Sequence, residues 1–100
     1  MPHVIWKFEL ELGSCEASIP EGFVPISVQY QHGQLTLWAL VNTSAQRKTY
    51  LFTTYATGEE MDVAAAAAIR NGDRIHLATV QQPPYKRFVW HIFYDRLPIA

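Results

Sequence analysis

Residues 27–42, SVQYQHGQLTLWALVN, constrain the fold more than any other stretch of this chain. Polar and apolar side chains alternate before His32-Gly33 and again after it, which is the pattern of a β-hairpin. In the second arm Trp38 stands between Leu37 and Ala39, so neither face of that strand is polar. A strand that is apolar on both faces predicts cover on both sides. We expect Leu37 and Ala39 to face one layer and Trp38 to face the other.

Other stretches also predict strands, because they alternate with a period of two or are rich in β-branched and aromatic residues. With the hairpin arms they span residues 4–12, 15–19, 23–30, 35–41, 47–56, 74–82 and 87–95. Residues 74–82 and 87–95 form the last predicted hairpin, joined by the turn Pro83-Pro84-Tyr85-Lys86. Pro25 lacks an N–H, so we expect the strand 23–30 to begin at a sheet edge.

The chain changes character in residues 59–73, EEMDVAAAAAIRNGD. Alanine favours helix, Asp62 is the predicted N-cap, and Asn71-Gly72 predicts the C-terminal cap, which leaves a helix of about nine residues. So short a helix must dock to be stable, and we expect it to supply one cover for the strand that contains Trp38. Residues 1–100 are therefore expected to form one β-rich α+β domain. It is a mostly antiparallel twisted sheet or small sandwich of six to seven strands with one short Ala-rich helix.

The amino-acid composition predicts the oligomeric state, the excluded partners and the location of the domain. Charged residues make up 17 % of the chain, against ~25 % in typical domains, and aromatic residues make up 13 %. The chain thus holds more apolar side chains than a small core easily hides, which predicts a homo-oligomer. The net charge of −1 predicts no extended nucleic acid and no membrane as partner. With Cys15 as its single cysteine, the chain is expected in the cytoplasm of a host cell.

The order of the landmarks resembles a family of small, uncharacterised proteins of phages and prophages. The matching residues are 5–8 (IWKF), 20–22 (PEG), 27–29 (SVQ) with Gly33, 37–42 (LWALVN), 56–58 (ATG), 78–80 (ATV) and 89–93 (VWHIF). The chain departs from the family pattern at Tyr30 and His32, at Ala56 in place of glycine, and in the Ala-rich helix. The resemblance implies a phage origin and a compact β domain, and it implies no activity.

Catalytic motifs are missing from the sequence. There is no nucleophile elbow, no P-loop and no dinucleotide fingerprint, so we expect no enzyme and no cofactor. His76 and His91 lie about equally far from the Pro83-Pro84 turn, so they could face each other across the hairpin. Such a pair would be an acid/base pair, half a metal site, or two structural residues in an aromatic sheet, and the last is the favoured interpretation.

Binding has more support, because basic residues alternate with aromatic ones. Such a surface could hold phosphates while it stacks a base, although solvated hairpin ends explain some of the bases equally well. The candidate ligand-binding residues are Arg47, Lys48, Tyr50, Arg70, Arg74, Tyr85, Lys86, Arg87 and His91.

Three functions remain as hypotheses. The first is a non-catalytic phage accessory protein that forms a homo-oligomer and sequesters a small anionic, nucleotide-like ligand used in host defence signalling. The second is an inhibitor that docks on a host protein through a sheet edge or an apolar face. The third is a minor structural or assembly component of the virion.

Overall fold

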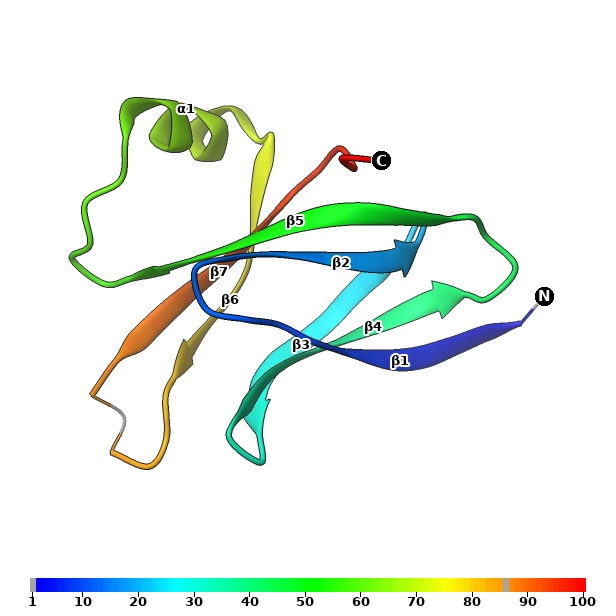
Figure 1. Cartoon of the computed structure of the whole chain (residues 1–100), viewed down its shortest axis with the longest axis horizontal. Coiled ribbons are helices and arrows are strands. Elements are labelled where there is room, and N and C mark those ends of the chain that lie inside the picture. Colours follow the sequence, from blue (N-terminus) through cyan, green and yellow to red (C-terminus); the bar gives the residue numbers. More distant parts are fainter. Residues whose placement is uncertain (1, 86) are drawn as a thin grey trace.

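A computed structural model of the protein describes residues 2–85 and 87–100. Within them the chain forms seven strands and one helix. They are β1 (His3–Glu9), β2 (Ser14–Pro20), β3 (Val24–Gln31), β4 (Gln34–Asn42), β5 (Arg47–Ala56), α1 (Val63–Asn71), β6 (Arg74–Gln81) and β7 (Val89–Asp95) (Figure 1). The predicted β-rich class, with six to seven antiparallel strands and one short helix, is confirmed.

The strands form two antiparallel sheets that share one core. A three-stranded sheet has the order β1-β4-β3, and a four-stranded sheet has the order β2-β5-β7-β6. The core draws on both sheets and consists of Leu10, Ile19, Phe23, Val28, Leu35, Leu37, Ala39, Val41, Tyr50, Phe52 and Ile92. Of the two forms expected from the sequence, the structure is the small sandwich.

Local sequence signals account for the turns and the helix ends. His32 and Gly33 both have positive φ, at 52° and 79°, so β3 and β4 are joined by a two-residue turn of the type that matches strand twist. The Asp62 carboxylate accepts a hydrogen bond from the Ala65 N–H at 2.7 Å, as an N-cap does. Gly72 closes the helix with φ 87°. The predicted turn at His32-Gly33, the N-cap at Asp62 and the C-terminal cap at Gly72 are all confirmed.

Strand β4 is fully covered on one face and only partly covered on the other. Leu37 and Ala39 are fully buried in the core, as expected. On the opposite face Leu40 is 37 % exposed, and Trp38 is partly exposed beside its cross-strand neighbours Lys7 and Ser27. The expectation that α1 covers this face is wrong. The helix packs beside β6 of the other sheet, because β6 follows it after only two residues.

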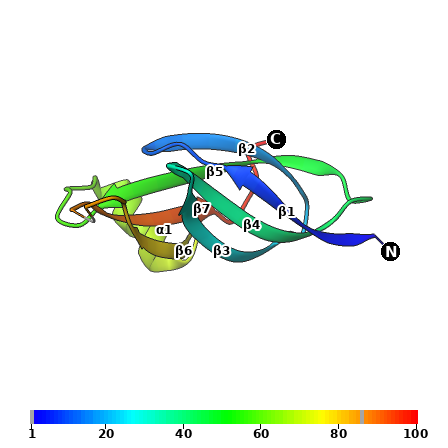
Figure 2. The same cartoon turned by 90° about the horizontal axis from the view of Figure 1, so that it is seen from below.

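Each sheet has two edge strands, and one edge of each, β3 and β6, lies beside the other. β3 is an edge strand, as Pro25 predicted, and the pairing with β4 shifts register between Pro25 and Ser27. β6 is an edge of the other sheet, and it runs beside β3 in both views of the molecule (Figures 1 and 2). The C-terminal tail packs too, since Thr49 exchanges backbone hydrogen bonds with Ile99 and Ala100 at 2.7 Å.

Candidate functional site

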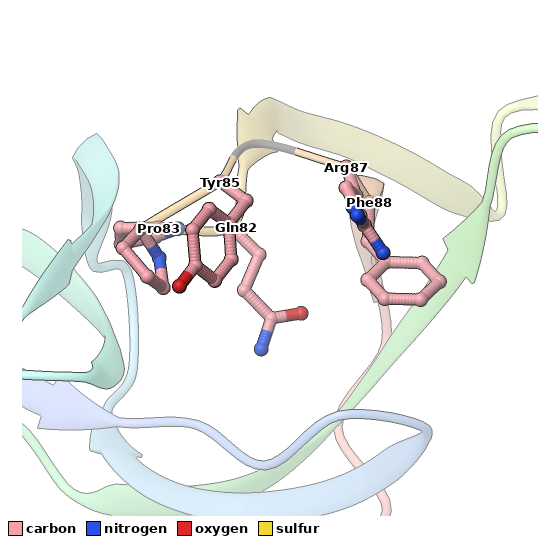
Figure 3. Close-up of a pocket in the computed structure, with 6 residues that line it drawn as sticks. Gln82, Pro83, Tyr85, Arg87 and Phe88 are labelled. Atoms are coloured by element: carbon pink, nitrogen blue, oxygen red, sulfur yellow. The ribbon is translucent and has the colours of Figure 1, made fainter.

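The loop that joins β6 to β7 forms a small aromatic pocket, which we call the loop slot. It has a volume of about 160 Å³ and is lined by Gln82, Pro83, Pro84, Tyr85, Arg87 and Phe88. Figure 3 shows Tyr85 beside Pro83 on one side of the opening, Arg87 and Phe88 on the other, and Gln82 between them. Tyr85 is 81 % exposed and Phe88 is 57 % exposed, so both rings are open to a partner.

Hydrogen bonds and stacking hold the slot to the sheet. The Gln82 N–H donates to the Phe88 carbonyl at 2.9 Å, which closes the base of the loop. The indole N–H of Trp90 donates to Gln82 Oε1 at 2.8 Å, which fixes this side chain and turns its NH₂ group to other acceptors. Phe88 stacks on Trp90 with ring centroids 6.0 Å apart. The floor and one wall of the slot are therefore held in place before any ligand arrives.

The charge of the slot comes from Arg87. Its guanidinium carbon lies 6.0 Å from the centre of the Tyr85 ring, within the range of a cation–π contact. Pockets for drug-sized ligands have volumes of ~300–1,000 Å³, so this slot fits a single planar ring and leaves the rest of a ligand outside. The arrangement can stack one ring between aromatic side chains, offer it an amide donor, and place a cation at the rim.

Arg74 lies elsewhere, in a structural network on the four-stranded sheet. Its guanidinium binds both carboxylate oxygens of Asp95, at 2.7 and 3.3 Å, and donates to the Tyr55 hydroxyl at 2.7 Å. The hydrogen bond to Asp95 is the main reason why the pKa of Arg74 is raised. The side chain is only 16 % exposed and its charge is matched, so Arg74 is not poised for an anion.

Three other predicted residues are distant from the slot. Arg47 donates to the Ser18 hydroxyl at 3.1 Å and lies 5.7 Å over the Trp6 ring. Arg47 and the partly buried Lys48 begin β5, whereas the slot adjoins the residues that pair with the other end of β5. Arg70 lies in the last turn of α1.

Tyr50 corrects one prediction outright. It is 4 % exposed and packs edge-on against Phe23 in the core, with centroids 4.9 Å apart, so it contacts no surface ligand. Burial raises the pKa of its hydroxyl. Of the remaining candidates, Lys86 lies outside the described residues. Among the described candidates, Tyr85 and Arg87 lie together in the loop slot, and the others do not line it.

The two histidines do not pair directly. His76 lies opposite Phe93 and His91 lies opposite Thr79, so the register of the β6–β7 ladder places the two histidines apart. They are instead bridged, since Thr79 Oγ1 is 3.0 Å from His76 Nε2 and 3.0 Å from His91 Nδ1. The Thr79 hydroxyl has one proton and can donate it to only one of the two imidazoles. The tautomers of the two histidines are therefore coupled. Among the described residues no group of three or more His, Cys, Asp or Glu could hold a metal ion.

Two residues of the slot lie outside the strands in which the sequence places them. The pattern places Phe88 in a strand that begins at residue 87, but β7 begins at Val89. It places Gln82 at the end of the preceding strand, which ends at Gln81. Tyr85 and Phe88, which both follow Pro83-Pro84 in the predicted hairpin, are a usable signal for such a site, because loop residues of a hairpin can face each other.

Comparison with known proteins gives a match at the level of a family. Residues 1–99 match the family model described as a domain of unknown function, DUF7352. No curated protein and no solved structure matches the chain. In the described part of the chain, no helix has the length and apolar character needed to cross a membrane.

Proposed function

We propose that this chain, which belongs to the DUF7352 family, is a non-catalytic binding protein. Its ligand would be a small anionic molecule with a planar ring, such as a nucleotide. The observation that carries this proposal is the loop slot, in which Tyr85 and Phe88 flank an opening with Gln82 at its floor and Arg87 at its rim. In this proposal the ring enters the slot and the phosphate stays outside against Arg87.

Each contact has a physical role. Stacking of a base on an aromatic side chain contributes about 1–3 kcal/mol, and it tolerates different bases because each has a π-face. The NH₂ group of Gln82 can donate to a ring nitrogen or a carbonyl of the base. Arg87 supplies a fork of donors for phosphate, which a lysine would not reproduce. Ligand recognition thus rests on one loop that is anchored to a rigid sheet.

The biological setting extends the proposal. The resemblance to small phage and prophage proteins suggests a phage origin, and the proposal adds a role against host defence signalling and a location in the host cytoplasm. A sequestering protein needs affinity and abundance but no catalytic group, which agrees with the lack of catalytic motifs. Mass spectrometry of purified particles tests the alternative of a virion component, which requires the protein to be present in them.

Calorimetric titration with cyclic nucleotides and ADP-ribose-derived nucleotides tests the proposal. We expect at least one of them to bind, and Tyr85→Ala to weaken binding by on the order of tenfold to hundredfold, as the loss of one stacking contact implies. Arg87→Gln should weaken phosphorylated ligands more than the matching nucleosides. Arg96→Gln is the matched control, since this exposed arginine pairs with Asp73 away from the loop. If no nucleotide binds, or if Tyr85→Ala binds like the wild type, the proposal is wrong.

A second candidate function is supported by the outer face of the three-stranded sheet. Ile5, Leu40 and Val24 form one cross-strand row over β1, β4 and β3, and they are 59, 37 and 53 % exposed. Contiguous exposed aliphatic residues are typical of protein contact surfaces. This row favours the expected homo-oligomer, or docking on a host protein. Light scattering at several concentrations, with Leu40→Lys as the variant, tests self-association, and a monomer at every concentration would rule it out.

A further inference from the structure

The seam between β3 and β6 is a gap between two sheet edges. A groove of about 640 Å³ runs along it, lined by Val28, Gln29, Tyr30, Thr79, Val80, Gln81 and Pro83. Cα atoms of the two strands come within 8 Å of each other. Nevertheless, no hydrogen bond joins β3 to β6 in the described part of the chain. The two hairpin tips lie apart in both views (Figures 1 and 2).

The backbone of β3 points into this seam. The Leu10 N–H donates to the Leu35 carbonyl at 2.8 Å, so the peptide groups of Leu35 face away from β3. Tyr30 is the cross-strand partner of Leu35. Because partners in an antiparallel pair exchange both hydrogen bonds or neither, Tyr30 turns its N–H and C=O away from β4. Val28 does the same, since it lies two residues earlier in a regular stretch.

The backbone of β6 points into the seam from the other side. The Thr57 N–H donates to the Val89 carbonyl at 3.1 Å, so Val89 faces β5. Its cross-strand partner is Gln81, which therefore turns its N–H and C=O away from β7. Thr79 follows the same alternation. The seam is thus bounded by two rows of backbone donors and acceptors that have no ladder partners among residues 2–85 and 87–100.

We propose that this seam binds a single extended segment of another polypeptide, which pairs with the free edges of β3 and β6 and joins the two sheets. Unpaired edges are templates for strand addition. A second copy of the folded chain does not fit, because its own sheet would collide with one wall. A lone strand fits, since both of its edges find partners. This is a function separate from the loop slot.

Side chains in the groove support a peptide occupant. Tyr30 has a buried hydroxyl oxygen that lacks a hydrogen-bond partner among the described residues, and burial raises the pKa of this hydroxyl. A buried unsatisfied polar group is costly, so this wall of the groove is a place where the fold gains from rearrangement. Val28 and Val80 offer apolar contacts for alternate side chains of the peptide. An inserted strand needs the two edges ~9.6 Å apart, twice the ladder spacing, so the hairpins must splay slightly. That movement breaks no hydrogen bond between the strands.

Selection from a displayed library of random linear peptides, followed by fluorescence polarisation with one enriched synthetic peptide, tests the proposal. Two variants at one position are compared. Gln81→Pro removes the N–H that points into the seam and leaves the bonds to β7 intact, whereas Gln81→Val keeps that N–H. We expect Gln81→Pro to bind the peptide about tenfold more weakly than Gln81→Val, as the loss of a hydrogen bond implies. Equal binding by the two variants, or a library without any binder, would overturn the proposal.

Hydrogen exchange on the wild-type protein decides the matter even if Gln81→Pro fails to fold. The amides of Tyr30 and Gln81 should exchange fast in the free protein and become protected in the peptide complex. Protection that stays unchanged would refute strand pairing. Because the loop slot is tested with nucleotides and the seam with peptides, failure of one proposal is distinguishable from failure of the other.

Discussion

Leu37 and Leu40 lie on opposite faces of β4, and replacing each by alanine measures how the two faces are covered. Leu37 is fully buried among core residues of both sheets, whereas Leu40 is 37 % exposed. Removing a fully buried leucine side chain costs about 2–5 kcal/mol, since it loses its transfer free energy and leaves a cavity. We therefore expect Leu37→Ala to lower the free energy of unfolding by about 3 kcal/mol. Leu40→Ala leaves no enclosed cavity, so we expect a loss of about 1 kcal/mol.

Urea denaturation followed by tryptophan fluorescence and circular dichroism measures both losses, at a concentration where light scattering shows a monomer. In a domain of this length 1 kcal/mol shifts Tm by roughly 4–8 °C, so Leu37→Ala should lower Tm by roughly 12–24 °C. The m-value, which is the slope of the free energy of unfolding against urea concentration, should be the same in both variants as in the wild type. Each substitution changes stability and not the surface exposed on unfolding. Losses of equal size would refute the reasoning. They would mean that the outer face of the three-stranded sheet is covered after all.

Three further predictions concern single side chains. Asp62→Ala should destabilise the protein by ~1 kcal/mol, measured by thermal denaturation, because the Ala65 N–H at the start of α1 loses its acceptor; an unchanged Tm would mean that the cap adds nothing. Burial raises the pKa of the Cys15 thiol, so the folded protein holds this proton more tightly than the unfolded chain and loses stability as pH rises above ~8.5, the ordinary value for cysteine. Iodoacetamide should accordingly alkylate Cys15 more slowly in the folded protein than in urea, and equal rates at one pH would contradict this. Asp95→Asn should cost about 1–2 kcal/mol, because it leaves the partly buried charge of Arg74 with a weaker partner; a stability like that of the wild type in urea denaturation would show the pair to be dispensable.

Much of the fold could be predicted from the sequence, and the residues that made it predictable act locally. His32-Gly33 specifies its turn through the φ values that the two residues adopt. Asp62 and Gly72 set the helix ends through hydrogen bonds that span only a few residues. Alternation places Leu37 and Ala39 on one face of a strand without reference to any other part of the chain.

Less of the candidate site could be predicted, for a reason that Tyr50 and Tyr85 illustrate. Both are tyrosines close to basic residues in the sequence, so pattern alone treats them alike. Tyr50 faces the opposite sheet and is buried, whereas Tyr85 lies on a hairpin loop and is exposed. Arg74 likewise depends on Asp95, which is far along the chain but adjacent across the β6–β7 ladder.

Local sequence is enough to place most of the strands, the turns and the helix, because those choices depend on backbone preferences and on contacts between near neighbours. Three features arise only when the sheets come together: which side of β4 is covered, which basic residues are matched by an acid, and that the unpaired edges of β3 and β6 run side by side. They depend on how two sheets are placed on each other. That placement is set by packing summed over the whole core, and a period of two along one strand carries no information about it.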